Sequence, residues 1–123
     1  MKMMLIDVEN ISVGVVDANG LDDYYKYIGC RCIDIVRRKI GGLPVEIVCD
    51  DEGLLVENPK LSALDMDGQP TLFGNLLIAS GRVVDGELTE LTTEEMYHIA
   101  EHLGVIITEN LDEVYIAIGD VDY

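Results

Sequence analysis

The sequence predicts one α+β domain spanning residues 1–123, with a mostly antiparallel sheet of five to seven strands and two helices, at about 21–28 and 92–103. Three observations carry this prediction. Short apolar runs alternate with turn residues, as in antiparallel sheets. Two stretches place apolar residues at helical spacing. The chain has 123 residues, enough for one domain, and no Pro- or Ser-rich linker divides it.

The strands are expected where aliphatic and β-branched residues run between turn signals. Leu76, Leu77 and Ile78 follow one another, which indicates a strand covered on both faces. Residues 57–71 are rich in Asn-Pro, Asp-Gly and Gln-Pro pairs and are expected to form an irregular loop. The expected strands are residues 3–8, 11–16, 30–39, 43–50, 72–79, 105–108 and 114–118.

The hairpin around Gly41-Gly42 offers a choice of register. A three-residue loop, residues 40–42, places Ile35 opposite Ile47 and joins two apolar faces. A two-residue loop instead places Asp34 opposite Cys49, so a carboxylate enters an apolar face. The sequence therefore favours the three-residue loop.

The first helix is predicted by apolar residues at positions i, i+3, i+4 and i+7. Gly29 follows the last of them and supplies a residue suited to ending a helix. Asp22 and Asp23 fall in the first turn, where the helix dipole favours negative charge. The apolar positions are Leu21, Tyr24, Tyr25 and Ile28.

The second helix carries the strongest local signals in the chain. Thr92 and Glu95 have the spacing of a capping box, in which each side chain accepts a hydrogen bond from the other residue's backbone. Gly104 is expected to end the helix. The expected apolar stripe consists of Met96, Ile99, Ala100 and Leu103.

The charge is unevenly distributed and indicates the kind of partner. Asp and Glu number 24 against 8 Lys and Arg, a net charge of −16, and residues 40–123 carry all of it. Such a surface opposes binding to nucleic acid or to anionic membranes. We expect a non-enzymatic binding protein that occupies a basic surface of a partner protein. The candidate contact residues lie on expected turns and polar helix faces: Asp85, Glu87, Glu90, Glu94 and Glu101.

A small basic cluster supports a second hypothesis. Arg31, Arg37 and Arg38 lie on or beside one expected strand and could bind a small anionic ligand of nucleotide type. Strand alternation, however, sends Arg37 and Arg38 to opposite faces. On this hypothesis the protein would bind or sequester a small molecule.

Two patterns that resemble metal sites do not meet the requirements of one. His98, Glu101 and His102 spell H-x-x-E-H, but peptidases with this motif need a further acidic ligand well downstream, and only 21 residues follow His102. We expect both histidines on the polar face of the second helix. Cys30 and Cys32 are expected on one strand face and Cys49 on the opposite side, so the three thiols do not converge. We therefore expect no metal, no cofactor and no catalytic residue.

The same composition indicates the protein's setting. No apolar run approaches the roughly 18 residues that a membrane-spanning helix needs. Three cysteines do not make the paired framework of a secreted domain. We expect a cytoplasmic protein, either a monomer or a homodimer.

Four structural motifs stand out between residues 20 and 104: Gly29 ending the first helix, the acidic turn at residues 50–53, Asn58 after it, and the strand entry at Gly74-Asn75. Together they resemble a family of small domains of unknown function that are encoded on phages, plasmids and conjugative elements of gut bacteria. The resemblance covers about residues 20–104, which leaves residues 105–123 as an extension. It implies a mobile-element setting and no catalytic residues.

Overall fold

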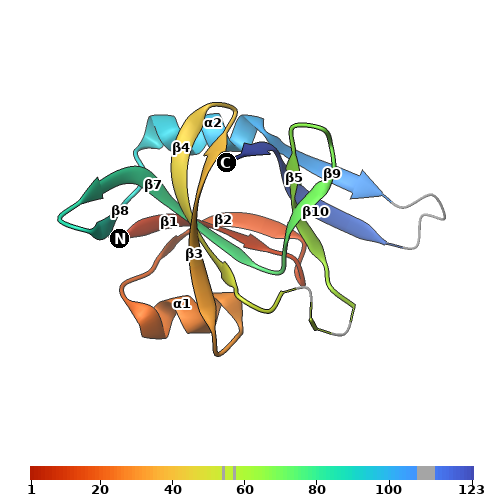
Figure 1. The fold of residues 1–123 in the computed structure, drawn as a ribbon, viewed down its shortest axis with the longest axis horizontal. Coiled ribbons are helices and arrows are strands. Elements are labelled where there is room, and N and C mark those ends of the chain that lie inside the picture. Colours follow the sequence, from red (N-terminus) through yellow and green to blue (C-terminus); the bar gives the residue numbers. More distant parts are fainter. Residues whose placement is uncertain (54, 57, 108–112) are drawn as a thin grey trace.

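The computed structural model describes residues 1–53, 55–56, 58–107 and 113–123 and is shown in Figure 1. Within these residues the chain forms ten strands and two helices. The first half of the chain contains β1 (Lys2–Asp7), β2 (Ser12–Asp17), α1 (Leu21–Ile28), β3 (Ile33–Ile40) and β4 (Leu43–Asp50). The second half contains β5 (Leu61–Asp65), β6 (Pro70–Phe73), β7 (Leu76–Val84), β8 (Glu87–Thr89), α2 (Thr93–Glu101), β9 (Leu103–Ile107) and β10 (Val114–Asp122).

The strands form one sheet in the order β2-β1-β7-β4-β3-β10-β5-β6, with β8 added to β7 and β9 added to β10. Among the described residues, β10 and β5 are parallel and the other pairs are antiparallel. The predicted α+β class with a mostly antiparallel sheet and two helices is thus confirmed. The predicted number of five to seven strands is wrong.

The strands that the sequence analysis did not predict are short and have weak local signals. Residues 57–71, expected to be a loop, contain β5 and the first residues of β6. Pro70 can begin β6 because β6 lies at the edge of the sheet, where a missing backbone donor is tolerated. The expected strand 72–79 is divided because Gly74 adopts a φ of 82° between β6 and β7. The three-residue strand β8 was also not predicted.

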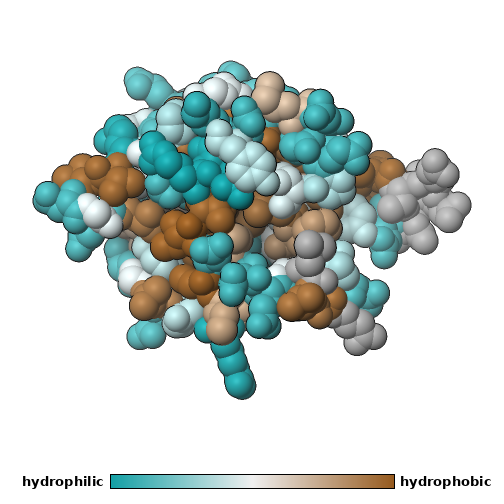
Figure 2. All heavy atoms as spheres, in the orientation of Figure 1, coloured by the Kyte–Doolittle hydropathy of each residue, from teal (hydrophilic) through white to brown (hydrophobic). Residues whose placement is uncertain are grey.

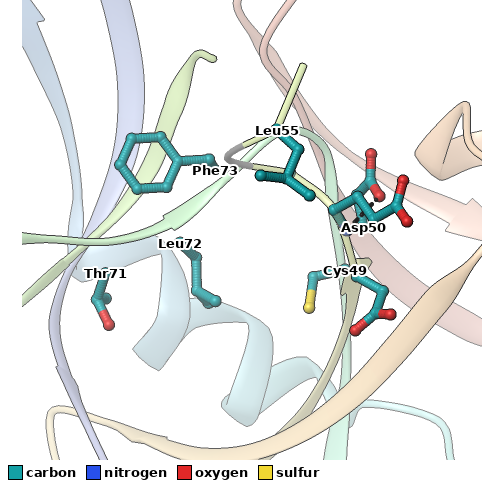
Figure 3. A pocket seen from close by; sticks show the side chains of 9 residues that line it. Cys49, Asp50, Leu55, Thr71, Leu72 and Phe73 are labelled. Carbon is teal, nitrogen blue, oxygen red and sulfur yellow. Dashed lines mark hydrogen bonds between the residues drawn. The ribbon is translucent and has the colours of Figure 1, made fainter.

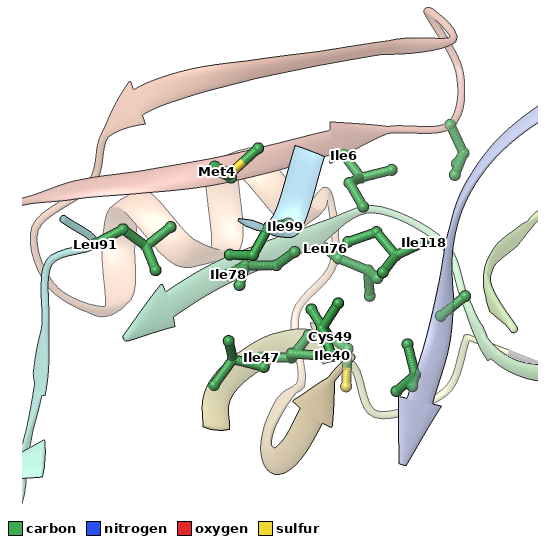
Figure 4. Close-up of a cluster of buried hydrophobic side chains, with 14 residues drawn as sticks. Met4, Ile6, Ile40, Ile47, Cys49, Leu76, Ile78, Leu91, Ile99 and Ile118 are labelled. Atoms are coloured by element: carbon green, nitrogen blue, oxygen red, sulfur yellow. The ribbon is translucent and has the colours of Figure 1, made fainter. Parts of the chain in front are cut away.

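The two helices cover opposite faces of the sheet. On the α2 face, Ile47 and Ile78 join a core cluster with Ile99, and Figure 4 shows this cluster. On the other face, Val48 and Leu77 pack with residues of α1. Leu76, Leu77, Ile78 and Ala79 are each fully buried, as the run of apolar residues predicts.

The predicted hairpin register is wrong, and the double-sided core explains why. Asp34 pairs with Cys49 and Val36 with Ile47. The loop has only two residues, Gly41 and Gly42, with φ of 52° and 85°, the positive values that a two-residue hairpin of type I′ requires. The opposite register was favoured to keep Asp34 out of an apolar face, but Asp34 lies exposed at the far end of the strand from the loop.

The first helix has the predicted bounds. Tyr24 and Ile28 are buried against the sheet, and the φ of 76° at Gly29 provides the left-handed cap. Leu21, by contrast, is 56% exposed and contributes little to the packed face. The expected spacing therefore identifies the helix correctly but its apolar stripe only in part, because Tyr27, and not Tyr25, packs against the core cluster.

The second helix has the predicted start and an earlier end. Thr92 and Glu95 form the predicted capping box, and the helix ends at Glu101 with His102 as its C-cap. Leu103 already belongs to β9 and pairs with Ile118, so Gly104 does not end the helix. Ala100, expected in the apolar stripe, is exposed.

Glu95 also ties the helix to the sheet. Its carboxylate accepts hydrogen bonds from Thr92 N, Ser80 Oγ and Arg82, at 2.9, 2.9 and 3.1 Å. Burial alone would raise the pKa of Glu95, but these hydrogen bonds outweigh it and lower the pKa. Because the folded pKa is depressed, this carboxylate stabilises the fold above its unfolded pKa, and that stabilisation is lost as pH falls through the folded value.

Candidate functional site

The outward face of α2 combines acidic side chains with an exposed aromatic ring. Glu94, Tyr97 and Glu101 have the spacing i, i+3, i+7 and therefore share one face of the helix. Both glutamates are exposed, and Tyr97 is 69% exposed. These three residues are called the α2 surface below. In Figure 2, hydrophilic residues dominate the top of the view, the side of the molecule on which Figure 1 shows α2.

The other three predicted acids precede α2 along the chain. Asp85 lies in the two-residue turn between β7 and β8, with a φ of 53°, and Glu87 begins β8. Both are exposed. Glu90 accepts a hydrogen bond from the backbone N of Lys2, at 3.0 Å, and so helps to hold the start of β1. The five predicted acids thus follow one continuous stretch, from the β7–β8 turn to the end of α2.

These acids are not neutralised by the basic side chains. Among the described residues, the arginine and lysine ion pairs go elsewhere: Arg37 to Glu46 at 2.7 Å, Lys60 to Glu9 at 2.9 Å and Arg82 to Glu95 at 3.1 Å. In the part of the chain that the structure describes, none of the five predicted acids forms an ion pair. The negative charge along this stretch is therefore available to a partner.

The structure does not bring the three predicted arginines together. Arg37 and Arg38 extend from opposite faces of β3, as strand alternation predicts. Arg37 is held by Glu46 and the carbonyl of Gly81, whereas the Arg38 guanidinium lies 4.3 Å from the centre of the Tyr123 ring. Arg31 is exposed and lies before β3, roughly 20 Å from Arg37 along an extended chain.

The sequence predicts both histidines on the solvent-facing surface of the helix, and the structure does not place them there. Both are partly buried. His98 Nε2 lies 2.8 Å from the carbonyl oxygen of Ile40, and His102 Nδ1 lies 3.0 Å from the carboxylate of Asp120. They therefore join α2 to the β3–β4 turn and to β10. Among the described residues, no group of three or more His, Cys, Asp or Glu has the arrangement of a metal site.

The three cysteines are free thiols in different surroundings. Cys30 and Cys32 precede β3 rather than lying within it, and Cys49 sits on the α2 face of β4, so the expected strand faces are wrong in detail. Burial raises the pKa of the Cys49 thiol to about 11, with a contribution from Asp34. Burial and the nearby Asp50 also raise the pKa of Cys30.

These differences predict a clear order of thiol reactivity. At pH 8 only roughly one Cys49 thiol in a thousand is ionised, and the thiolate is the reactive form. Brief treatment with iodoacetamide should label the exposed Cys32 first and should label Cys49 only after unfolding. Peptide mapping by mass spectrometry measures this order, with Cys32→Ser removing the fast phase. Equal labelling of Cys49 and Cys32 in the folded protein would contradict the burial of Cys49.

The turn that follows β4 closes a small cavity of about 150 Å³. Figure 3 shows Cys49 and Leu72 facing each other across it, with Phe73 and Leu55 beside them. Gly53 is required here because a Cβ at this position would lie 2.8 Å from the carbonyl oxygen of Phe73. The acidic turn at residues 50–53 is therefore shaped by close backbone packing.

Sequence reasoning missed Tyr97, although a signal for it was present. Tyr97 falls outside the apolar stripe of the second helix, which places a large aromatic ring in solvent. It also missed a second cavity beside Asp50, because that cavity is built by segments distant in sequence. No single local pattern could have indicated it.

None of the described helices is long and apolar enough to cross a membrane.

Comparison with known proteins places the chain in a family. No curated protein and no solved structure matches the chain. A family match covers residues 1–104, so it includes β1 and β2, which lie before the region of resemblance seen in the sequence. On the strength of this match, which confirms the resemblance, the protein belongs to the family described as Domain of unknown function (DUF3846).

Proposed function

We propose that this protein is a non-enzymatic binding protein that occupies a basic surface of a partner protein with the α2 surface. The observation that carries the proposal is the exposed Tyr97 ring between two glutamates that form no ion pair with any described residue. Tyrosine is enriched among residues that dominate binding energy, because its ring covers a large area and its hydroxyl remains polar. Glutamates beside it would select a partner rich in Lys and Arg.

The α2 surface is also well positioned for binding. The capping box fixes the start of the helix, and Ile99 anchors its opposite side in the core. A rigid helix loses little conformational entropy when a partner binds to it. Asp85 and Glu87, at the β7–β8 turn, extend the negative charge along the chain and would add long-range attraction.

The test is capture by the immobilised protein and by a charge-reversed variant, Glu94→Lys with Glu101→Lys. The variant should fold normally, because the two changes have opposite effects on the stability of α2. A lysine at position 94 interacts unfavourably with the helix dipole, and a lysine at position 101 interacts favourably with it. We expect the wild type to retain a basic protein from a lysate of the native host, and the variant to retain at least tenfold less of that same protein. Quantitative mass spectrometry measures the difference.

A matched control separates the α2 surface from overall charge. Asp34→Lys with Asp67→Lys makes the same change in net charge at two exposed positions away from α2. This control should retain the partner to within about twofold. Equal capture by the wild type and the α2 variant would contradict the proposal, and so would equal loss in the α2 variant and the control.

The setting belongs to the proposal as well. From the resemblance, we propose that the protein is an accessory of a mobile genetic element that acts on a protein of its host. Three free thiols support the expected reducing compartment, the cytoplasm. Neither statement bears on the capture experiment, which tests the α2 surface alone.

A further inference from the structure

A second cavity, of about 320 Å³, shares the lining residue Asp50 with the small cavity described above. The buried residues Val8 and Ile28 contribute apolar surface to it. Its volume falls in the range of small-molecule sites. Residues from five separate segments line it, including Gly29, Asp50, Asn58, Gly74 and Asn75.

Each of those five residues belongs to one of the motifs through which the sequence resembles its family, although the rest of the acidic turn, residues 51–53, does not line the cavity. Some of them have structural tasks: the Asn75 amide accepts a hydrogen bond from Val8 N and donates one to the Tyr27 carbonyl, both at 2.9 Å. Gly74 N donates to the carbonyl of Lys60 at 2.8 Å. These contacts fix the walls, so the cavity is a formed part of the fold.

The charges at the cavity are unequal. Lys60 Nζ pairs with Glu9 Oε2 at 2.9 Å. Asp50 accepts a hydrogen bond from Glu52 N, at 2.9 Å, also lies beside the Cys30 thiol, whose pKa it raises, and forms no ion pair with any described residue. The cavity is thus lined by two acidic residues, Glu9 and Asp50, and one basic residue, Lys60, and Asp51 and Glu52 follow in the same turn. An anion is disfavoured here and a cation is favoured.

We infer that this cavity binds a small organic cation, a free ammonium or guanidinium compound with a short apolar chain. One cationic group pairs with the Asp50 carboxylate, and the methylene chain packs on Val8 and Ile28, so that a second cationic group at the far end of the chain remains in solvent. The site is independent of the proposed α2 surface, since none of the α2 residues lines it.

The test is a titration with agmatine, followed by nuclear magnetic resonance of the backbone amides at low salt. Saturable shifts are expected at Gly29, Gly74 and Asn75. Asp50→Asn keeps an oxygen that can accept from Glu52 N but loses the charge, and should weaken binding tenfold or more. Asp51→Asn, an equal charge change in the neighbouring residue, should change the affinity less than threefold.

Two further measurements test the assignment of the cavity. Lys60→Met removes the competing ammonium group and should tighten agmatine binding, which loss of folding could not produce. Absence of saturable shifts in the wild type, or equal weakening by Asp50→Asn and Asp51→Asn, would overturn the assignment. Tighter binding of a capped arginine than of agmatine would also overturn it, because the site would then hold a side chain of a partner protein.

Discussion

Ile99→Ala is expected to lower the free energy of unfolding by about 2–5 kcal/mol, the range for truncating a large aliphatic side chain in a core. Ile99 is fully buried and is the one buried residue of α2, all of whose residues the structure describes. It packs in the cluster that contains Met4, Ile47 and Ile78 (Figure 4). Its loss leaves a cavity and removes a central apolar contact between α2 and the sheet.

Urea unfolding measures this effect, with Thr92→Ala as the internal reference. Thr92→Ala removes the capping hydrogen bond to Glu95 N and should cost about 1 kcal/mol. Both variants act on the same helix, one through its end and one through its packed side. An Ile99→Ala loss no larger than the Thr92→Ala loss would mean that α2 is not anchored through Ile99.

Gly81→Ala is expected to destabilise the protein by about 1–3 kcal/mol or more, because it overpacks a place where two backbones meet. A Cβ at Gly81 would lie 2.4 Å from the carbonyl oxygen of Pro44 and 2.7 Å from its Cβ. Neither neighbour is the end of a flexible side chain. To relieve this steric clash, β7 must therefore move away from β4, although Val45 and Ser80 pair immediately beside the contact.

Gly14→Ala provides the matched control. Gly14 also lies in a strand, but no atom comes within 4 Å of the position its Cβ would take. Alanine should be neutral there or stabilising by up to about 1 kcal/mol, since glycine has a higher entropy in the unfolded chain. Thermal unfolding of the two variants compares them. Similar melting temperatures for Gly81→Ala and Gly14→Ala would contradict the close β4–β7 approach.

The helices could be predicted because their signals are local. A capping box needs only two residues three positions apart, and a glycine ends a helix through its own φ. Thr92, Glu95 and Gly29 therefore carried enough information without knowledge of the rest of the chain. The end of α2 was misplaced because Leu103 leaves the helix to pair with Ile118, a contact 15 residues away.

The sheet was harder to predict because pairing is not local. The register of β3 and β4 was chosen for a sheet with one apolar face, whereas Ile47 and Val48 are both fully buried on opposite faces. With both faces covered, alternation no longer selects one register. β5 was missed for a related reason: one of its two partners, β10, lies about fifty residues later in the chain, and the other, β6, begins within the stretch expected to be a loop.

The candidate site likewise has parts that local sequence patterns predict and parts that depend on the folded chain. The acids on α2 followed from charge and helix spacing, and Tyr97 could have been found from the same spacing. The cavity beside Asp50 depends on how five segments meet, which only the folded chain shows. The predicted arginine site separated because neighbouring residues of a strand face opposite ways, so Arg37 and Arg38 have different partners.

The central claim, that the α2 surface recognises a basic partner, is tested most directly by the binding kinetics of the captured protein. Glu94→Lys with Glu101→Lys should slow association, and the wild-type association rate should fall steeply as salt rises. Tyr97→Ala should instead speed dissociation and leave association nearly unchanged. If both variants keep the wild-type association and dissociation rates, the partner binds elsewhere and the claim is wrong.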